Sequence, residues 1–142
     1  MLMDKYIELV YHNPLFIILV AAFVTDTLLG ISRSIKERRI NSSIGIDGLI
    51  RKSSMLVVVS VLAFVDLLVG IDVLFWLPEA VKNFLSLEKL GLSEFFSLLF
   101  LMFETLSILK NMTIIGLPVP KKVQSSLEDF LNNMTGELDK EL

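Results

Sequence analysis

Three long apolar blocks, separated by stretches richer in charge, glycine, proline and serine, dominate the chain. They cover roughly residues 15–31, 55–71 and 95–112. Each block is close to the ~17–25 residues that a helix needs to cross a hydrocarbon core about 30 Å thick. We therefore predict an all-α membrane protein with three transmembrane helices, at residues 15–32, 53–71 and 94–112.

One acidic residue interrupts each apolar block, at Asp26, Asp66 and Glu104. A central aspartate costs about 2.5–3.5 kcal/mol on the insertion scale, whereas each Leu, Ile, Phe or Val contributes about −0.3 to −0.6 kcal/mol. The first block holds eleven such residues, so insertion remains favourable. The alternative, a soluble helical bundle, could not bury three helices that are apolar all round.

The segments between and after the blocks predict smaller elements. Residues 40–50 contain two glycines and two serines and are expected to form a turn-rich connector. Pro78 and Gly91 bound a short amphipathic helix, expected on the outer membrane surface or, alternatively, packed on the bundle. The tail at 117–142 is expected to form an amphipathic cytoplasmic helix, because apolar residues recur every three or four positions at Val123, Leu127, Phe130, Met134 and Leu138.

The distribution of cations predicts the orientation in the membrane. The second connection carries only Lys82 and Lys89, whereas the first is strongly basic. Because cytoplasmic loops carry the excess of Lys and Arg, the N-terminus is expected outside and the C-terminus in the cytoplasm. The residues of the first connection that we expect to act as cytoplasmic membrane anchors are Arg33, Arg38, Arg39, Arg51 and Lys52.

Polar side chains within the apolar blocks are the candidate functional residues. Asp26 with Gly30, and Asp66 with Gly70, each place an acid and a glycine four residues apart on one helix face, which favours a packed helix interface. A polar stripe along the third helix adds Ser93, Ser97, Glu104, Ser107 and Asn111. The candidate oligomer interface or pore lining is therefore Asp26, Gly30, Asp66, Gly70, Ser97, Glu104, Ser107 and Asn111.

Two interpretations of the third-helix stripe remain open. In the first, the serines hydrogen-bond to their own backbone, and Glu104 is neutral or paired within one subunit. In the second, several copies of the chain turn the stripe toward one another or toward an aqueous lumen. Because three helices per chain cannot enclose a wide pore, the second interpretation requires a homo-oligomer.

Composition excludes several classes of chemistry. The chain has no cysteine, one histidine and a formal net charge of −3. A disulfide framework and a thiolate metal site are therefore absent, and no cofactor is expected. The sequence contains no nucleophile and base pair, metal cluster or phosphate loop, so we do not expect an enzyme. Nucleic acid is not an expected partner either, because no basic face with interleaved aromatic residues is present.

From about Asp26 to Val123, the sequence resembles the toxin-secretion/phage-lysis holin family. The resemblance rests on D-x-x-x-G at 26–30, NSSIGIDGLIRK at 41–52, Asp66, and ETLSILKNMTIIGLPVPKKV at 104–123. Among holins, the chain is similar to the holin-like export proteins encoded beside large clostridial toxins. Lys110 departs from the pattern of many lysis members, which carry an acid before the asparagine.

The resemblance implies a single holin-like domain over residues 1–142 in the bacterial cytoplasmic membrane. Such a protein oligomerises and opens lesions through which a folded toxin or cell-wall hydrolase crosses without a signal peptide. Its expected partners are the lipid bilayer, copies of itself and the exported cargo. Two alternatives stay open: an antiholin or accessory regulator that does not form a pore, and a small ion-coupled transporter that uses the acids as ion sites.

Overall fold

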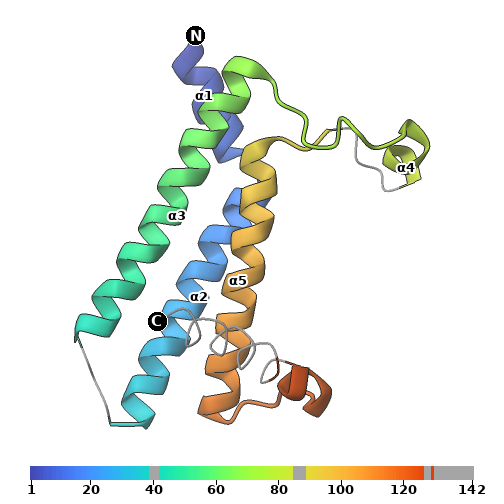
Figure 1. Cartoon of the computed structure of the whole chain (residues 1–142). Coiled ribbons are helices and arrows are strands. Elements are labelled where there is room, and N and C mark those ends of the chain that lie inside the picture. Colours follow the sequence, from blue (N-terminus) through green and yellow to red (C-terminus); the bar gives the residue numbers. More distant parts are fainter. Residues whose placement is uncertain (39–41, 85–88, 127–128, 130–142) are drawn as a thin grey trace, which may run out of the picture.

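The computed structural model describes residues 1–38, 42–84, 89–126 and 129. Within these residues the regular structure is helical and contains no strand. The helices are α1 (Leu2–Tyr11), α2 (Pro14–Lys36), α3 (Ser42–Val69), α4 (Glu79–Phe84) and α5 (Leu92–Ile115). Figure 1 shows α2, α3 and α5 side by side as an elongated bundle, with α1 above α2 and α4 on an arm that leaves the bundle sideways.

Three of these helices are long and apolar enough to cross a membrane: Pro14–Lys36, Gly45–Val69 and Leu92–Ile115. The prediction of three candidate transmembrane helices is thus confirmed. The expected connector at residues 40–50 is not, because the chain is helical from Ser42 onward. A glycine within a helix costs only about 1 kcal/mol relative to alanine, and a segment in lipid must satisfy its backbone internally. Gly45 and Gly48 therefore do not interrupt α3.

The break between α1 and α2 is encoded by Asn13 and Pro14. The Asn13 side chain accepts hydrogen bonds from the backbone nitrogens of Leu15 (2.9 Å) and Phe16 (3.3 Å), and Pro14 occupies the first helical position, where no N–H is needed. As a result, α1 is a separate helix, which the sequence analysis did not predict.

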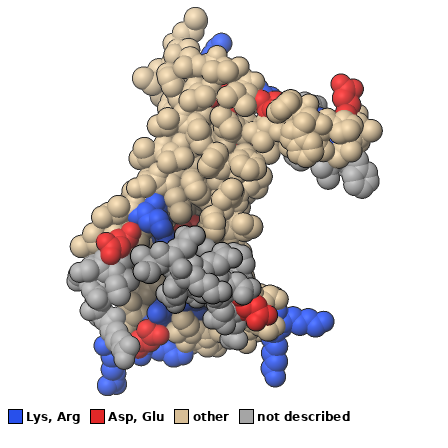
Figure 2. All heavy atoms as spheres, viewed as in Figure 1, with Lys and Arg blue, Asp and Glu red and all other residues tan. Residues whose placement is uncertain are grey.

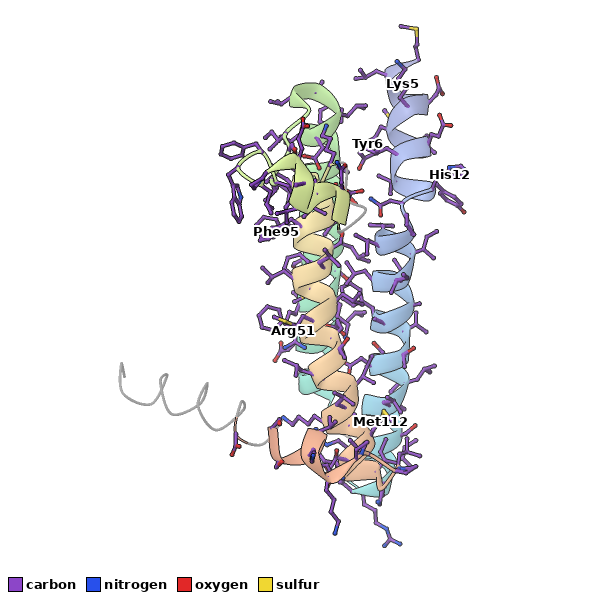
Figure 3. The ribbon with its side chains drawn as sticks, turned by 90° about the vertical axis from the view of Figure 1, so that its right-hand side faces the viewer. Lys5, Tyr6, His12, Arg51, Phe95 and Met112 are labelled. Atoms are coloured by element: carbon purple, nitrogen blue, oxygen red, sulfur yellow. The ribbon has the colours of Figure 1, made fainter. Side chains whose placement is uncertain are left out.

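Helix α1 packs against α3. The Tyr6 hydroxyl donates to the carbonyl oxygen of Ser60 (3.0 Å), and its ring meets Phe64 edge to face at 5.8 Å. Figure 3 shows Tyr6 on the side of α1 that faces the bundle. The Tyr6 hydroxyl thus has a hydrogen-bond partner and the ring packs against an apolar neighbour. A tyrosine that packs in an apolar setting usually needs both contacts.

Helix α5 is the central helix, because it packs against both α2 and α3. A buried apolar cluster of Leu19, Phe23 and Val59 fills the half of the bundle nearer α1, and Phe96 and Phe100 of α5 pack against it.

At the end of the bundle opposite α1, α5 stops at Gly116, whose φ of +92° favours glycine. The Lys36 ammonium group donates to the carbonyl oxygens of Ile114 (3.1 Å) and Ile115 there. We call this end of the bundle, which holds the ends of α2 and α5 and the start of α3, the basic end.

The arm between α3 and α5 is closed by Asp72. Its carboxylate accepts hydrogen bonds from the backbone nitrogens of Leu74 (2.9 Å) and Leu90 (3.2 Å), and the Lys82 ammonium donates to it at 2.9 Å. These contacts, the Lys82 hydrogen bond above all, lower the pKa of Asp72 to about 2. A short helix, α4, is present on this arm, and its location on the membrane surface stays a prediction.

The C-terminal tail is only partly described. Residues 121–126 are helical, and Val123 is among them. Leu127, Phe130, Met134 and Leu138 lie outside the described residues. The amphipathic cytoplasmic tail helix therefore stays a prediction.

Candidate functional site

The intramembrane acids of α2 and α5 meet one lysine of α3. The Lys52 ammonium group donates to Oδ2 of Asp26 at 2.9 Å and to Oε2 of Glu104. All three residues are buried, with exposed fractions of 7% for Lys52, 6% for Asp26 and 1% for Glu104. One ammonium group thus links the three long helices through two carboxyl groups.

Two further contacts complete this arrangement. The Asn111 side-chain amide donates to Oδ1 of Asp26 at 2.8 Å. The Lys52 ammonium lies 5.1 Å from the centre of the Phe23 ring, within the range of a cation–π interaction. We call Asp26, Lys52, Glu104 and Asn111 the polar network. Among the described residues, every fully buried side-chain nitrogen or oxygen has a hydrogen-bond partner, so the network leaves none of its fully buried polar atoms unpaired within one chain.

The polar network lies near the middle of the bundle. Glu104 is about 17 Å from either end of α5 at 1.5 Å per residue. In a bilayer with a hydrocarbon core about 30 Å thick, this position is close to the midplane. Charged groups are costly at that depth and are found facing the interior of a bundle or water.

The stripe predicted on α5 faces the interior of the bundle. Ser93, Ser97, Glu104 and Asn111 are all buried. The Ser97 hydroxyl donates to the carbonyl oxygen of Ser93 at 2.7 Å, and Glu104 is paired with Lys52. In the single chain, the first interpretation of the stripe therefore holds for Ser97 and Glu104. Ser107 is half-buried and borders a cleft beside the network.

Asp66 has a different role, at the opposite end of the bundle from the basic end. Its carboxylate accepts hydrogen bonds from the backbone nitrogens of Leu92 (3.0 Å) and Ser93 (2.8 Å) and from the Ser93 hydroxyl (2.7 Å). These are the first N–H groups of α5, which lack partners within the helix. Asp66 of α3 thus caps α5. Gly91 permits the contact, since a Cβ atom there would lie 2.7 Å from Asp66 Oδ2.

The two glycines of the predicted acid and glycine pairs also differ. A Cβ atom on Gly30 would lie 3.9 Å from the Asn111 side chain, so Gly30 faces α5 at a helix contact within one chain. Gly70 follows the end of α3 and has a φ of +68°. Its N–H bonds to the Asp66 carbonyl oxygen at 2.8 Å, so within one chain Gly70 ends a helix and does not serve a helix interface.

The predicted membrane anchors fall into four groups. Arg33 and Arg38 lie at the basic end, where Arg33 is 3.4 Å from Glu37, and Arg51 is exposed. Arg39 lies outside the described residues. Lys52 does not reach the headgroups, because α3 begins well before it and carries it two to three turns into the bundle, where the two acids hold it.

Three roles were not predicted from the sequence: Lys52 is the counter-ion of the two acids, Lys36 caps the C-terminal end of α5, and Gly91 leaves space for the Asp66 carboxylate. A signal for Lys52 existed, because two acids at mid-depth on different helices require a cation at the same depth. Extending the second membrane helix through Gly45 would have placed Lys52 there.

A cleft of about 820 Å³ adjoins the polar network on the side of the basic end. It is lined by α2 from Asp26 to Glu37, by α3 from Gly45 to Lys52, and by Ser107, Lys110 and Asn111 of α5. The polar network therefore lies between two different surroundings. The apolar cluster around Leu19 packs on the side nearer α1, and the polar cleft lies on the side of the basic end.

Three apolar helices of spanning length that share a central polar network define a small multi-pass membrane protein. The chain belongs to the bacteriophage holin family, whose model matches residues 9–132. This confirms the resemblance carried by residues 26–123, and it supports a location in the cytoplasmic membrane.

Two relatives are similar over most of the chain. The Holin-like protein TcdE of Clostridioides difficile is 50% identical over 114 residues, which cover 80% of this chain and 69% of the relative. An uncharacterized 14.9 kDa protein in the nagH 3' region of Clostridium perfringens is 32% identical over 120 residues, covering 84% of this chain and 77% of the relative. No solved structure matches the chain.

Proposed function

We propose that this chain is a holin that oligomerises in the bacterial cytoplasmic membrane and lets large folded proteins, such as a toxin or a cell-wall hydrolase, cross it without a signal peptide. Membership of the holin family and the similarity to the Holin-like protein TcdE support this proposal. One observation carries it within the chain: a polar network at mid-depth in three otherwise apolar helices.

A three-helix protein that always stays closed would not need this network. Replacing a buried ion pair by apolar residues is often neutral or stabilising, whereas ionisable residues inside membranes are typical of surfaces that face water or a partner in at least one state. We infer that a single subunit holds Asp26, Lys52, Glu104 and Asn111 in a satisfied, closed arrangement. In the assembly, the helices separate and the same groups face a hydrated lumen.

The remaining candidate residues fit this scheme in two ways. Ser107 borders the cleft next to the network and Gly30 faces Asn111 across the contact of α2 with α5, so both join the lumen when the helices separate. Asp66 keeps α3 attached to the start of α5 and acts as a pivot. Since one chain supplies only three spanning helices, a passage for a folded protein requires several copies.

The test is expression of the full chain in a bacterium, with membrane potential and release of a folded cytosolic reporter enzyme as the measurements. The decisive variant replaces the whole polar network by apolar residues: Asp26→Leu, Lys52→Met, Glu104→Leu and Asn111→Leu. It removes every partner at once, so no buried charge is left unpaired, and we expect normal insertion. We also expect reporter release to be lost, because an apolar lumen is not hydrated.

The matched control is Thr25→Val with Thr105→Val. These residues adjoin Asp26 and Glu104 in the sequence, but both are exposed and each hydroxyl bonds only to its own helix at 2.8 Å. This control is expected to release the reporter like the parent. If the apolar variant released the reporter equally well, the network would not line the passage. If the parent chain released nothing when expressed alone, the antiholin alternative would be favoured.

A further inference from the structure

The cleft beside the polar network contains cations from all three long helices. Arg33 lies on α2, Arg51 on α3 and Lys110 on α5. Two acids also line the cleft: Asp26 is bound by Lys52, and Glu37 lies 3.4 Å from Arg33. Within the part of the chain that the structure describes, neither Arg51 nor Lys110 forms an ion pair. Two positive charges on α3 and α5 thus border one cavity without a described counter-ion.

The cleft lining also contains apolar side chains that are largely exposed. Ile31, Ile35 and Leu49 line it with exposed fractions of 52%, 62% and 62%. On α3, a Cβ atom at Gly45 or Gly48 would meet nothing within 4 Å. A cavity of about 820 Å³ whose lining includes these apolar side chains and two cations fits a ligand that is both apolar and negatively charged.

The depth of Arg33 and Lys110 suits the phosphate layer of one bilayer leaflet, and Arg51 lies deeper. Arg33 lies in the last turn of α2 and Lys110 between one and two turns from the end of α5. Figure 3 shows Arg51 well inside the bundle from the basic end, but its long apolar stem allows the guanidinium group to extend toward that end. Basic pockets between membrane helices are typical sites for anionic lipid headgroups.

We propose that this cleft binds a phosphate group, with Arg51 and Lys110 as its contacting cations, and that the exposed apolar side chains of Ile31, Ile35 and Leu49 select an anionic phospholipid over a free phosphate. The Arg51 guanidinium group can bind two phosphate oxygens at once, and the Lys110 ammonium group adds a point charge from the facing helix. The site is complete in a single subunit, so the proposal does not depend on pore formation.

The experiment measures thermal unfolding of the purified full chain in a neutral detergent. Three probes are titrated separately: dihexanoyl-phosphatidylglycerol, dihexanoyl-phosphatidylcholine and inorganic phosphate. The cleft variant is Arg51→Gln with Lys110→Gln. Its matched control is Lys121→Gln with Lys122→Gln, which removes the same charge from exposed positions that do not line the cleft.

We expect phosphatidylglycerol to raise the unfolding temperature of the parent and of the control, with a half-saturating concentration about tenfold or more higher in the cleft variant. Phosphatidylcholine and inorganic phosphate should have little effect. If inorganic phosphate raised the unfolding temperature of the parent as much as phosphatidylglycerol does, but not that of the cleft variant, the phosphate site would stand. Its assignment to a lipid would be overturned. An equal effect of phosphatidylcholine, or the same titration in parent and cleft variant, would overturn the proposal. Circular dichroism of both variants verifies that they are folded.

Discussion

The Lys52 Nζ atom lies 2.9 Å from the Asp26 Oδ2 atom, and the same ammonium group also donates to Glu104. One cation on α3 therefore serves two acids, one on α2 and one on α5. Removing Lys52 leaves two buried carboxyl groups without a counter-ion. Removing one of the two acids leaves Lys52 paired with the other acid, so it leaves no buried charge unpaired.

Replacement of Lys52 by Met is therefore expected to lower the free energy of unfolding by about 3–5 kcal/mol, which is the cost of leaving buried charges unpaired. The adjacent Arg51→Met is the control. Arg51 is exposed, so its replacement should change stability by no more than about 0.5 kcal/mol. Both values are measured by unfolding in mixed detergent and SDS micelles, followed by circular dichroism. Equal losses in the two variants would contradict the assignment of Lys52 to the network.

Glu104→Leu is expected to cost less than Lys52→Met, because Lys52 keeps Asp26 as its partner. The double variant should then lose less than the sum of the two single losses, since part of the damage done by Lys52→Met is an unpaired Glu104. Residues in one ion-pair network show coupling energies of about 0.5–3 kcal/mol. A double-mutant cycle with the same unfolding assay measures this coupling, and simple additivity would show that Glu104 and Lys52 act independently.

The three spanning helices could be predicted because each consists of a long apolar block, and such blocks have few alternatives in a bilayer. The start of α3 could not. Gly45 and Gly48 are typical of turns in water, but in α3 they continue a helix flanked by the exposed apolar residues Ile46 and Leu49. This one misplaced boundary also moved Lys52 from the network to the headgroups.

The caps of α5 depended on contacts between residues far apart in the sequence. Asp66 accepts from Leu92, 26 residues later, and Lys36 donates to Ile114, 78 residues later. No local pattern contains such pairs.

The buried stripe from Ser93 to Asn111 was visible in the sequence because its spacing follows one face of one helix. The partner of that face, within one chain or between copies, is set by tertiary packing.

Gly91→Ala should disrupt the cap that Asp66 provides for α5. The added Cβ atom would lie 2.7 Å from Asp66 Oδ2, so the carboxylate must withdraw from the backbone nitrogens of Leu92 and Ser93. Loss of a helix cap costs about 0.5–2 kcal/mol, and we expect a decrease of this size in the unfolding assay. Gly48→Ala is the control. It has open space around it, so stability should be unchanged or higher by up to about 1 kcal/mol.

The contact of Asp72 with Lys82 predicts a pH dependence confined to acid. Because the folded pKa of Asp72 is about 2, below its usual value of 3.8, its contribution to stability is complete above about pH 4 and is lost as the pH falls through 2. Trp76, the only tryptophan of the chain, lies on the same arm and is exposed. Its fluorescence anisotropy should be constant from pH 7 to 4 and fall below that range. Asp72→Asn should abolish this transition, and a transition near neutral pH would contradict the assignment.

The two ends of the bundle differ in charge, which predicts the topology. Lys and Arg gather at the basic end (Figure 2), where the described residues include Arg33, Lys36 and Arg38. The end that holds α1 and the arm carries acids such as Asp4, Glu8 and Asp72 beside few cations. Since the cytoplasmic side collects the positive charge, the basic end should lie in the cytoplasm and α1 outside.

Because the chain has no cysteine, single cysteines can report this topology directly. His12→Cys, exposed at the end of α1, should react with a membrane-impermeant maleimide in intact spheroplasts. Lys122→Cys, exposed after α5, should react only after the membrane is permeabilised. The labelling must be done at expression levels that leave the membrane potential intact, because an open lesion would admit the reagent to both sides. Labelling of Lys122→Cys and protection of His12→Cys under these conditions would reverse the orientation. The cleft with Arg51 and Lys110 would then open toward the outer leaflet.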